Sequence, residues 1–165
     1  SKEEKTEITI FGKKNGVVFS PNMSIGVNIT FKLLQIAATL FNKNYDIEII
    51  ESHHKNKVDA PSGTALEMAK IISSSNTFLS DHNYCFNRVT SSGPRKEGEI
   101  GFSVIRGGDI VGEHSVLFAG MGEVIEISHK SNSRDSYAQG ALLASEFLCK
   151  NPPAFYNMSD VLGFN

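Results

Sequence analysis

The sequence has little cysteine, little net charge and no long apolar run, and each shortage excludes a class of protein. Cys85 and Cys149 are its two cysteines and form no CxxC pair, which argues against a disulfide framework or a zinc knuckle and favours a reducing compartment. The 16 Lys and Arg residues nearly balance the 18 Asp and Glu residues, for a net charge of -2. No overall electrostatic field therefore favours a nucleic acid or an anionic membrane as partner.

Membrane and export signals are also missing from the sequence. No segment approaches the roughly 20 consecutive apolar residues that a membrane span needs, and residues 1–5 lack the apolar stretch of a signal peptide. We therefore expect a cytoplasmic protein without a membrane partner. At 165 residues, 40% of them hydrophobic, the chain is long enough to bury a core, so one compact domain is the default expectation.

Apolar residues recur at helical spacing in several places. Phe31, Leu34 and Ala38 mark one stripe of a helix over about residues 25–41. Its other side is apolar as well, which predicts burial between layers or in a subunit interface. Spacing, capping and stop signals also predict helices over residues 1–11 closed by Gly12, over about residues 62–73, and from an N-cap at Ser133 to the Pro152-Pro153 pair.

Strand signals fall into two groups. The apolar run at residues 16–20 does not alternate, as in a strand buried on both faces of a parallel sheet. Residues 46–51 mostly alternate, as a half-buried strand does. Gly107-Gly108 fits a two-residue hairpin turn, so the later strands should form an antiparallel meander. Those strands are expected over residues 99–106, 109–119 and 123–130, after a short strand at 84–89 and a mobile loop at 90–98, and the apolar tail at 154–165 is expected to be packed.

The stretch from Glu51 to Ala65, ESHHKNKVDAPSGTA, joins the alternating strand to the next helix and concentrates titratable groups. Successive strand residues point to opposite faces, so His53 and His54 face one site only if the backbone turns between them. A histidine with its ordinary pKa gives or takes a proton near neutral pH, and Lys57 adds a cation. Together they suit an anionic substrate that must be protonated, with a hydrogen-bonded structural histidine as the alternative for either ring.

The entrance to the following helix has the features of an anion site. Pro61 disfavours helical geometry at Ala60, so the helix should begin around Ser62-Gly63-Thr64. A helix start presents unpaired backbone N–H groups and the positive end of the helix dipole. Gly63 leaves room for close approach, and the neighbouring hydroxyls either bind a carboxylate or simply cap the helix.

Two other interpretations of this stretch carry less weight, as does a nucleotide-binding interpretation of residues 120–122. Asp59 pairing with Lys57 would make a structural ion pair, which leaves the two histidines unexplained. A metal site is not expected, because His53 and His54 are adjacent and the sequence has no HExxH. Gly120-Met121-Gly122 lacks the third glycine of a GxGxxG fingerprint and leads into a strand, so this sequence offers no phosphate cradle for NAD(P)H.

The same stretch resembles the signature of the bacterial dihydrodipicolinate reductases. The resemblance covers essentially the whole chain, through the segments at residues 22–28, 101–102, 106–114 and 129–134. It implies an enzyme that reduces 4-hydroxy-tetrahydrodipicolinate, a small dicarboxylate, with NADH or NADPH on the route to diaminopimelate and lysine.

Carried over by position, the resemblance implies a role for each site residue. His53 is the active-site acid/base and Lys57 the proton donor. His54 contacts the substrate, and Ser62-Gly63-Thr64 holds a substrate carboxylate. The family's nicotinamide loop falls on Ser20-Pro21-Asn22-Met23, where many members carry Ala-Ala-Asn and an aromatic residue. The expected cofactor is therefore NADH or NADPH.

The resemblance also implies the architecture. Residues 1–23 correspond to a remnant of the NAD(P)-binding Rossmann domain, residues 24–134 to a substrate-binding and tetramerisation domain, and residues 135–165 to the segment returning to the cofactor domain. We expect an α+β fold with a mixed, largely antiparallel sheet, helices on one face, and a homotetramer formed through that sheet. The chain is expected to be the substrate-binding part of the reductase, inactive alone; the alternative is a non-enzymatic oligomerisation or dicarboxylate-binding module.

Overall fold

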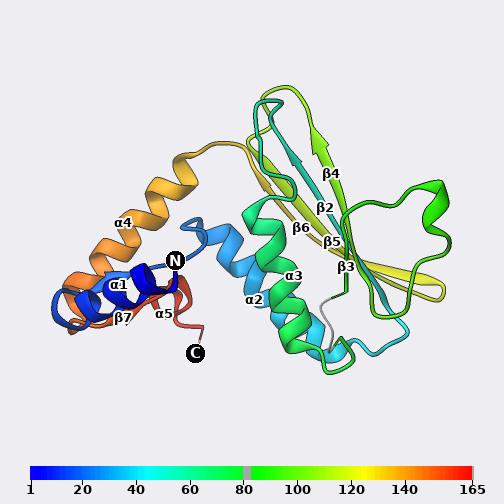
Figure 1. Ribbon diagram of the computed structural model, residues 1–165. Helices are drawn as coiled ribbons and strands as arrows, with labels where there is room; N and C mark the ends of the chain where they lie inside the picture. The colour runs from blue at the N-terminus through cyan, green and yellow to red at the C-terminus, as the bar shows by residue number, and fades with distance from the viewer. Residues whose placement is uncertain (80–82, 165) are drawn as a thin grey trace. The chain divides into compact units, whose positions relative to one another are not determined.

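The structure is a computed structural model and describes residues 1–79 and 83–164. The chain divides into two compact units, one of residues 29–133 and one of residues 1–28 with 134–165. Helices and a mixed sheet make an α+β fold, as the sequence predicts (Figure 1). Among the helices that the structure describes, none is both long and apolar enough to cross a membrane.

The larger unit is built on a five-stranded mixed sheet in the order β3-β4-β2-β5-β6. Its central strand, β2 (Asp46–His53), runs parallel to β4 (Ile100–Arg106) and antiparallel to β5 (Gly112–Gly120). The short β3 (Tyr84–Cys85) and the long β6 (Glu123–Ser131) form the two edges. The strand that carries His53 is therefore held on both sides by hydrogen-bonded neighbours.

Two helices, α2 (Ile25–Leu40) and α3 (Gly63–Ser75), cover one face of this sheet (Figure 1). The core lies between the helices and the sheet, because alternate strand residues turn their apolar side chains to the same face. Each fully buried Leu or Ile there contributes roughly 1.5–3 kcal/mol through the hydrophobic effect. The buried side chains include Phe31, Leu34, Ala38, Ile47, Ile49, Ala65, Met68, Ala69, Ile72, Val116 and Phe118.

The other side of α2 is exposed rather than buried between layers. Ile29, Leu33 and Ile36 are 44–49% exposed and Leu40 is 77% exposed. A row of exposed apolar side chains on one helix is typical of a contact surface. The subunit interface that the sequence suggests for this helix therefore stays a prediction.

The expected antiparallel meander is wrong for its first two strands. β4 and β5 are not neighbours, because β2 lies between them and pairs with both. Gly107 and Gly108 therefore do not close a hairpin: the N–H of Gly107 donates to the carbonyl of His53 at 2.9 Å, and the N–H of Lys55 donates to the carbonyl of Gly108 at 3.2 Å. The parallel β2–β4 pair is connected through α3, the kind of crossover that parallel strands need. The β5–β6 hairpin is present as expected.

The segment between β3 and β4 is tied to the start of β2. The strand expected over residues 84–89 ends after two residues, and a short 3-10 helix, η1 (Thr90–Ser92), follows. The Arg95 guanidinium contacts Asp46 at 3.1 Å and Glu48 at 2.5 Å, and Arg88 contacts Glu48 at 2.7 Å. Two arginines on the connection thus share one carboxylate of the central strand.

The smaller unit pairs segments from the two ends of the chain. β1 (Val17–Val18) runs parallel to β7 (Phe155–Tyr156), so the expected parallel pairing is present. The strand is only two residues long and half-buried, however, not buried on both faces. α1 (Lys2–Asn15), α4 (Asp135–Lys150) and α5 (Met158–Leu162) complete the unit. The first residue of α5 is fully buried, so the apolar tail is packed as expected.

The end of α1 differs from the sequence expectation. The helix does not stop at Gly12 but continues to Gly16, whose φ of 71° lies in the region that favours glycine. Gly12 serves a packing role instead, because a Cβ at this position would stand 3.3 Å from the ring of Phe155. A glycine near the end of a helical pattern is a stop signal only where the backbone turns, and here it does not.

The start of α4 also differs, by one residue. The N-cap is Arg134, not Ser133, and its side chain makes no capping hydrogen bond. Further along, Gly140 lies against the backbone of Met23, where a Cβ would stand 1.8 Å from the carbonyl oxygen. The segment that precedes α2 is therefore packed directly on α4.

Candidate functional site

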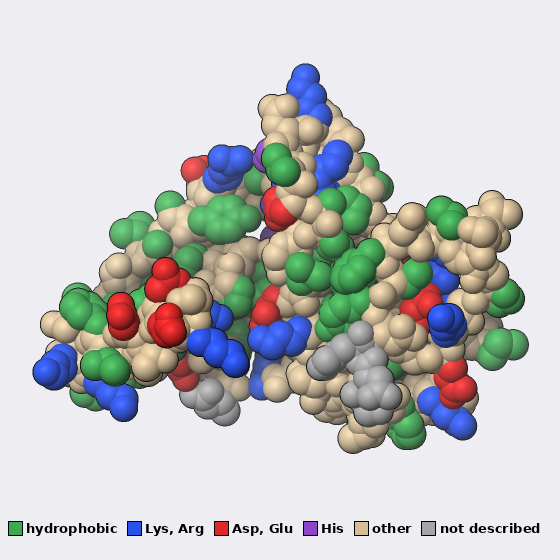
Figure 2. Space-filling view, viewed as in Figure 1, with side chains coloured by type: hydrophobic (Ala, Val, Ile, Leu, Met, Phe, Trp, Pro, Cys, Tyr) green, Lys and Arg blue, Asp and Glu red, His purple; other side chains and the backbone are tan. Residues whose placement is uncertain are grey.

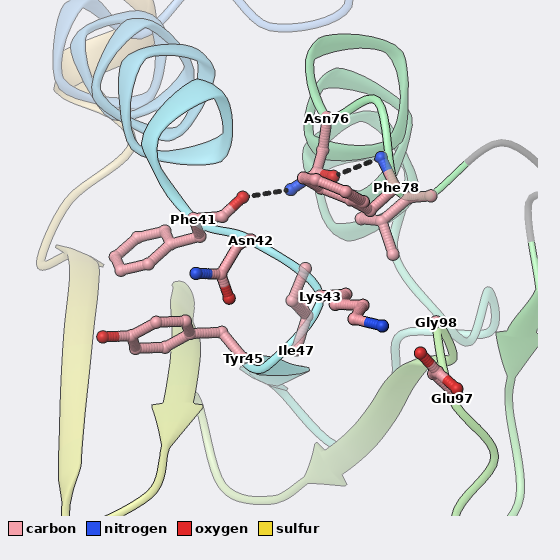
Figure 3. A pocket seen from close by; sticks show the side chains of 10 residues that line it. Phe41, Asn42, Lys43, Tyr45, Ile47, Asn76, Phe78, Glu97 and Gly98 are labelled. Atoms are coloured by element: carbon pink, nitrogen blue, oxygen red, sulfur yellow. Dashed lines mark hydrogen bonds between the residues drawn. The ribbon is translucent and has the colours of Figure 1, made fainter.

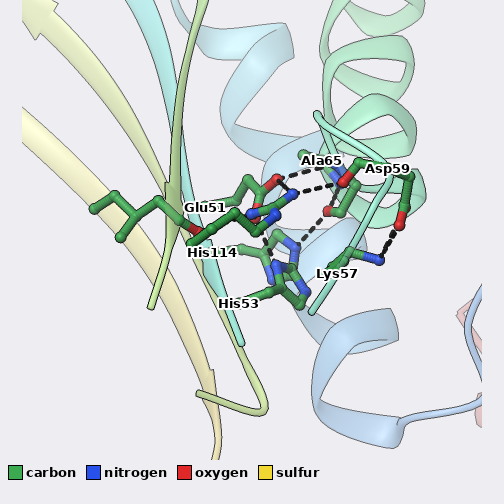
Figure 4. Close-up of polar contacts among 9 residues, drawn as sticks. Glu51, His53, Lys57, Asp59, Ala65 and His114 are labelled. Carbon is green, nitrogen blue, oxygen red and sulfur yellow. Dashed lines mark hydrogen bonds and ion pairs between the residues drawn. The ribbon is translucent and has the colours of Figure 1, made fainter. Parts of the chain in front are cut away.

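The candidate site lies at the C-terminal end of β2, where the chain leaves the sheet and enters α3 (Figure 4). His53 is the last residue of β2 and is 9% exposed. Lys57 follows within a turn in which its N–H donates to the carbonyl of His54 at 3.1 Å. Ser62 stands directly before the first residue of α3. One short loop therefore carries the two expected catalytic residues and the expected anion site.

A buried carboxylate organises this region. Glu51 is 1% exposed, and its Oε2 lies 2.5 Å from Nδ1 of His53. Arg106 donates to both carboxylate oxygens, at 2.8 Å and 2.7 Å, and the N–H of Ser62 donates to Oε1 at 3.0 Å. Burial raises the pKa of Glu51, but the hydrogen bonds from Arg106 and His53 outweigh it and hold that pKa below its ordinary value. Glu51 is therefore an anion that joins β2, β4 and the start of α3.

Lys57 is engaged by the carboxylate of Asp59. Its Nζ donates to Oδ1 at 2.7 Å and to Oδ2 at 2.8 Å. The hydrogen bond from Lys57 lowers the pKa of Asp59. Because the Asp59 side chain is 58% exposed, water screens the pair, and such pairs contribute about 0–1 kcal/mol. The ion pair that the sequence offers as a structural alternative is thus present, and it is weak enough for a ligand to displace.

At the start of α3, Ser62 caps the helix, whereas the backbone at Gly63 is open to approach. The Oγ of Ser62 accepts from the N–H of Ala65 at 3.2 Å and lies 3.0 Å from Nε2 of His114, so this hydroxyl has the capping role. Around Gly63, in contrast, the described residues outside its own helical turn place no atom within 4 Å of where a Cβ would stand. Thr64 is half-buried in the same first turn. The positive end of the helix is therefore approachable at Gly63.

Two further histidines lie on the neighbouring strands. His114 on β5 packs edge-on against His53, with ring centroids 5.1 Å apart. Burial, with a smaller effect of His53, lowers the pKa of His114 to about 4, and burial also lowers the pKa of His129 on β6. Both rings are therefore uncharged at neutral pH. In the described part of the chain, no group of three His, Cys, Asp or Glu side chains is arranged to hold a metal ion; His82 lies outside that part.

Cationic side chains lie at this end of the larger unit, and two of them are paired with carboxylates. Figure 2 shows Lys and Arg side chains, with histidine beside them, over the loops that follow β2 and β4. Lys55, Lys57 and Arg106 belong to these segments, and His54 lies half-buried directly after β2. Since the whole chain carries a net charge of -2, any attraction of an anion must come from a local arrangement of charges.

The four residues expected at the nicotinamide belong to the smaller unit, directly before α2. Asn22 is buried, and its Oδ1 accepts from the N–H of Ser24 at 2.8 Å. Its carbonyl accepts from the side-chain amide of Asn28 at 2.8 Å. Together with the contact between Met23 and Gly140, these bonds hold the segment in one conformation. Ser20 and Met23 remain half-buried and Pro21 exposed.

Sequence reasoning missed Glu51, Arg106 and His114. A signal for Glu51 was present, because residues i and i+2 of a strand share a face, and Glu51 therefore points to the same side as His53. Arg106 and His114 had no such signal. Both reach the site only because β2 lies between β4 and β5, a strand order that the expected meander excluded.

A hollow lies at the opposite end of β2, away from the candidate site (Figure 3). It encloses about 250 Å³ between the ends of α2 and α3 and the start of β2. The Asn76 side chain braces its wall by donating to the carbonyl of Phe41 at 3.1 Å and accepting from the N–H of Phe78 at 2.9 Å. The hollow is separated from His53 by the length of β2 and is not part of the candidate site.

Comparison with known proteins assigns the chain to a family. The family model described as "Dihydrodipicolinate reductase, C-terminus" matches residues 26–162. The 4-hydroxy-tetrahydrodipicolinate reductase of Polynucleobacter necessarius subsp. necessarius is 60% identical over 147 residues, which cover 89% of this chain and 55% of that protein. The enzyme of the same name from Burkholderia thailandensis is 55% identical over 163 residues, which cover 99% of this chain and 61% of that protein.

A solved structure shares the fold. The dipicolinate-bound dihydrodipicolinate reductase from Paenisporosarcina sp. TG-14 matches with a TM-score of 0.74 and 26% sequence identity, over 95% of this chain and 59% of that chain. This chain thus spans little more than half the length of the relatives it matches. The family match includes β2, the loop after it and α3, which together form the candidate site. The chain therefore belongs to the family described as dihydrodipicolinate reductase, C-terminus.

Proposed function

We propose that this chain is the substrate-binding part of a 4-hydroxy-tetrahydrodipicolinate reductase, an NAD(P)H-dependent oxidoreductase of diaminopimelate and lysine biosynthesis. The observation that carries the proposal is the meeting of His53, Lys57 and the open start of α3 at one end of β2. The ammonium of Lys57 and the positive end of α3 both attract a carboxylate. They stand there beside the imidazole of His53, a type of side chain that exchanges protons. The family match and the names of the relatives support the same reaction.

The substrate carboxylates provide the first role for these residues. One carboxylate approaches α3 at Gly63, where the absence of a side chain exposes the first-turn backbone and the dipole end. Thr64 lies in the same turn, and Ser62 supports it from inside as the cap. A substrate carboxylate also competes with Asp59 for the ammonium of Lys57, since the Asp59 side of that ion pair is exposed.

Proton delivery is the second role. The ammonium of Lys57, which is paired with Asp59, stands in the loop that faces the bound dicarboxylate, so Lys57 is the proposed proton donor. His53 is proposed as the acid/base of the site, held in place through its Nδ1 by Glu51. His54, directly beside it, is proposed to contact the substrate. A nicotinamide, when bound, supplies the hydride that these residues complement with a proton.

The nicotinamide contact is assigned to Ser20-Pro21-Asn22-Met23. This segment fits such a role, because Asn22 and the packing on α4 fix its backbone while three of its side chains reach the surface of their unit. A fixed backbone at the ring costs less ordering entropy on binding than a free loop would.

The proposal is tested by calorimetry with pyridine-2,6-dicarboxylate, a stable ring dicarboxylate. The parent chain is expected to bind. Lys57→Ala removes the cation and is expected to weaken binding by about tenfold or more, the usual effect of losing a charge-assisted contact. Gly63→Val fills open space, so the fold should be retained while the approach to the helix start is blocked.

Lys70→Ala on the exposed side of α3 removes the same charge away from the loop and is the matched control. It is expected to bind like the parent. Equal binding by all four proteins, or no binding by a parent shown to be folded by circular dichroism, would show that the anion site is assigned wrongly.

A homotetramer is the proposed assembly, formed through the sheet face that the helices leave open. That face carries apolar side chains on four strands, which include Ile50, Ile105, Leu117 and Val124, and Ile105 and Val124 are 50% and 60% exposed. Exposed apolar area on a sheet face favours burial against another surface. Sedimentation of the chain at micromolar concentration checks this, and a monomer there would count against the tetramer.

The alternative function, a non-enzymatic dicarboxylate-binding or oligomerisation module, predicts the same titration results. The two functions predict different gene structures. An upstream reading frame that continues into this chain and encodes a GxGxxG strand–turn–helix favours the reductase. A native start codon close to Ser1 favours the module.

A further inference from the structure

Glu51 is placed to control the orientation of His53. The two residues lie two positions apart on β2 and face the same side of the sheet, and the carboxylate is the group in contact with Nδ1, at 2.5 Å. The carboxylate cannot swing away, because Arg106 binds it through two nitrogens and the N–H of Ser62 binds Oε1. Three hydrogen bonds from two segments, β4 and the start of α3, therefore fix the acceptor that His53 meets.

The protonation of Glu51 decides which nitrogen of His53 carries the proton. An ionised carboxylate only accepts hydrogen bonds, so a contact at this distance requires a proton on Nδ1. Arg106 keeps the carboxylate ionised. Neutral His53 then has its lone pair on Nε2, which lies 3.1 Å from the position that a Cβ at Gly112 would occupy.

Within the described residues, the contacts of the His53 ring give Glu51 no competitor. The other titratable ring in contact with His53 is His114, which burial keeps neutral and whose own Nε2 lies 3.0 Å from the hydroxyl of Ser62. Gly112, as a glycine, places no side chain against the ring. Glu51 is therefore the charged group that selects between the two neutral forms of His53.

We infer that Glu51, clamped by Arg106, is the positioning residue of the site: it holds His53 in the Nδ1–H tautomer and so makes Nε2 the nitrogen that exchanges a proton with the reacting molecule. The inference rests on the proposed function for the role of His53, but the tautomer itself does not. Glu51 does not touch the substrate in this scheme and acts only through His53, as the orienting carboxylate does in other histidine-based sites.

Nitrogen-15 NMR of the imidazole side chains measures the tautomer directly, without ligand or turnover. The chain has five histidines, and loss of signals in His53→Gln assigns those of His53. At about pH 8, above the ordinary histidine pKa of about 6.5, the parent is expected to show a protonated Nδ1 and a bare Nε2. Glu51→Gln keeps the size of the side chain but can donate to Nδ1, so the bare nitrogen is expected to shift from Nε2 toward Nδ1.

Glu126→Gln, on the exposed strand β6, removes a carboxylate away from His53 and is expected to leave the spectrum unchanged. A parent with its lone pair on Nδ1 overturns the inference even if Glu51→Gln does not fold. An unchanged tautomer in a folded Glu51→Gln overturns it as well, because a purely structural Glu51 predicts that result. If dicarboxylate binding fails while the tautomer shifts as expected, the proposed function fails and the positioning role stands.

Discussion

The ammonium of Lys57 and the carboxylate of Asp59 form a bidentate ion pair at the mouth of the site, with Nζ 2.7 Å and 2.8 Å from the two oxygens. The pair is two residues apart and therefore needs only a turn of the loop, not the tertiary structure, to form. In this pair Asp59 neutralises the positive charge of Lys57, the residue that is the proposed proton donor. A ligand carboxylate therefore competes with Asp59 for Lys57.

Asp59→Asn is expected to tighten binding of pyridine-2,6-dicarboxylate about two- to fivefold, because the exposed pair that the ligand displaces is worth about 0–1 kcal/mol. Calorimetry against the parent measures the change. Glu67→Gln on α3 changes the net charge equally and serves as the control. Weaker binding by Asp59→Asn alone would mean that Asp59 orients Lys57 for the ligand instead of competing with it.

The buried ring of His114 predicts how stability depends on pH. Its folded pKa of about 4 lies below the ordinary value of 6.5, so the unfolded chain binds a proton that the folded chain excludes. This histidine therefore lowers the stability of the parent progressively as pH falls from about 6.5 to about 4, by up to about 3 kcal/mol. No such loss occurs above about pH 6.5.

His114→Gln is expected to remove most of that loss. Urea unfolding at about pH 5 and about pH 7.5 should show a smaller difference in free energy for the variant than for the parent. Glu51, whose folded pKa is lowered, loses its own stabilising effect only as pH falls through that lowered value, and it does so in both proteins. An equal difference in the two proteins would show that His114 is protonated in the folded state.

Gly140→Ala sets two effects of opposite sign against each other. In an exposed helix, alanine is more favourable than glycine by about 0.8–1 kcal/mol. Here a Cβ would stand 1.8 Å from the carbonyl oxygen of Met23, so the backbone before α2 must move. We expect a net loss of about 1–3 kcal/mol, typical of overpacking. Denaturant unfolding checks the sign, with Ser145→Ala on the exposed side of α4 as the control; a stabilised Gly140→Ala would refute the packing.

Glu48 is predicted to restrain the connection between β3 and β4, since Arg88 and Arg95 both bind its carboxylate. Glu48→Gln keeps both arginines, and with them the trypsin sites, but weakens the carboxylate contact that the two arginines share. Cleavage after Arg95 or Lys96 by trypsin is expected to become several-fold faster, because cleavage tracks the fraction of time that the segment is open. Glu126→Gln should be cleaved at the parental rate. Equal cleavage rates for the two variants would argue against the restraint.

Local signals predicted most of the elements. The apolar spacing from Ile25 places α2, Ser62 starts α3, and the alternation from Asp46 marks β2, because each depends on residues that are close in sequence. Glycines were less reliable: Gly12 resembles a stop signal but serves packing, and the turn at Gly107-Gly108 does not close a hairpin. A glycine shows that the backbone has freedom, not how the structure uses it.

The sequence by itself determined the loop that carries His53, Lys57 and the start of α3, because a strand, a proline and a capping serine within a few residues leave little choice of geometry. Only the tertiary structure decided what surrounds His53. β2 lies between β4 and β5, and this order brings Arg106 to Glu51 and His114 to Ser62. Strand order depends on how the whole sheet buries its apolar face, a sum over distant residues that no short stretch of sequence contains.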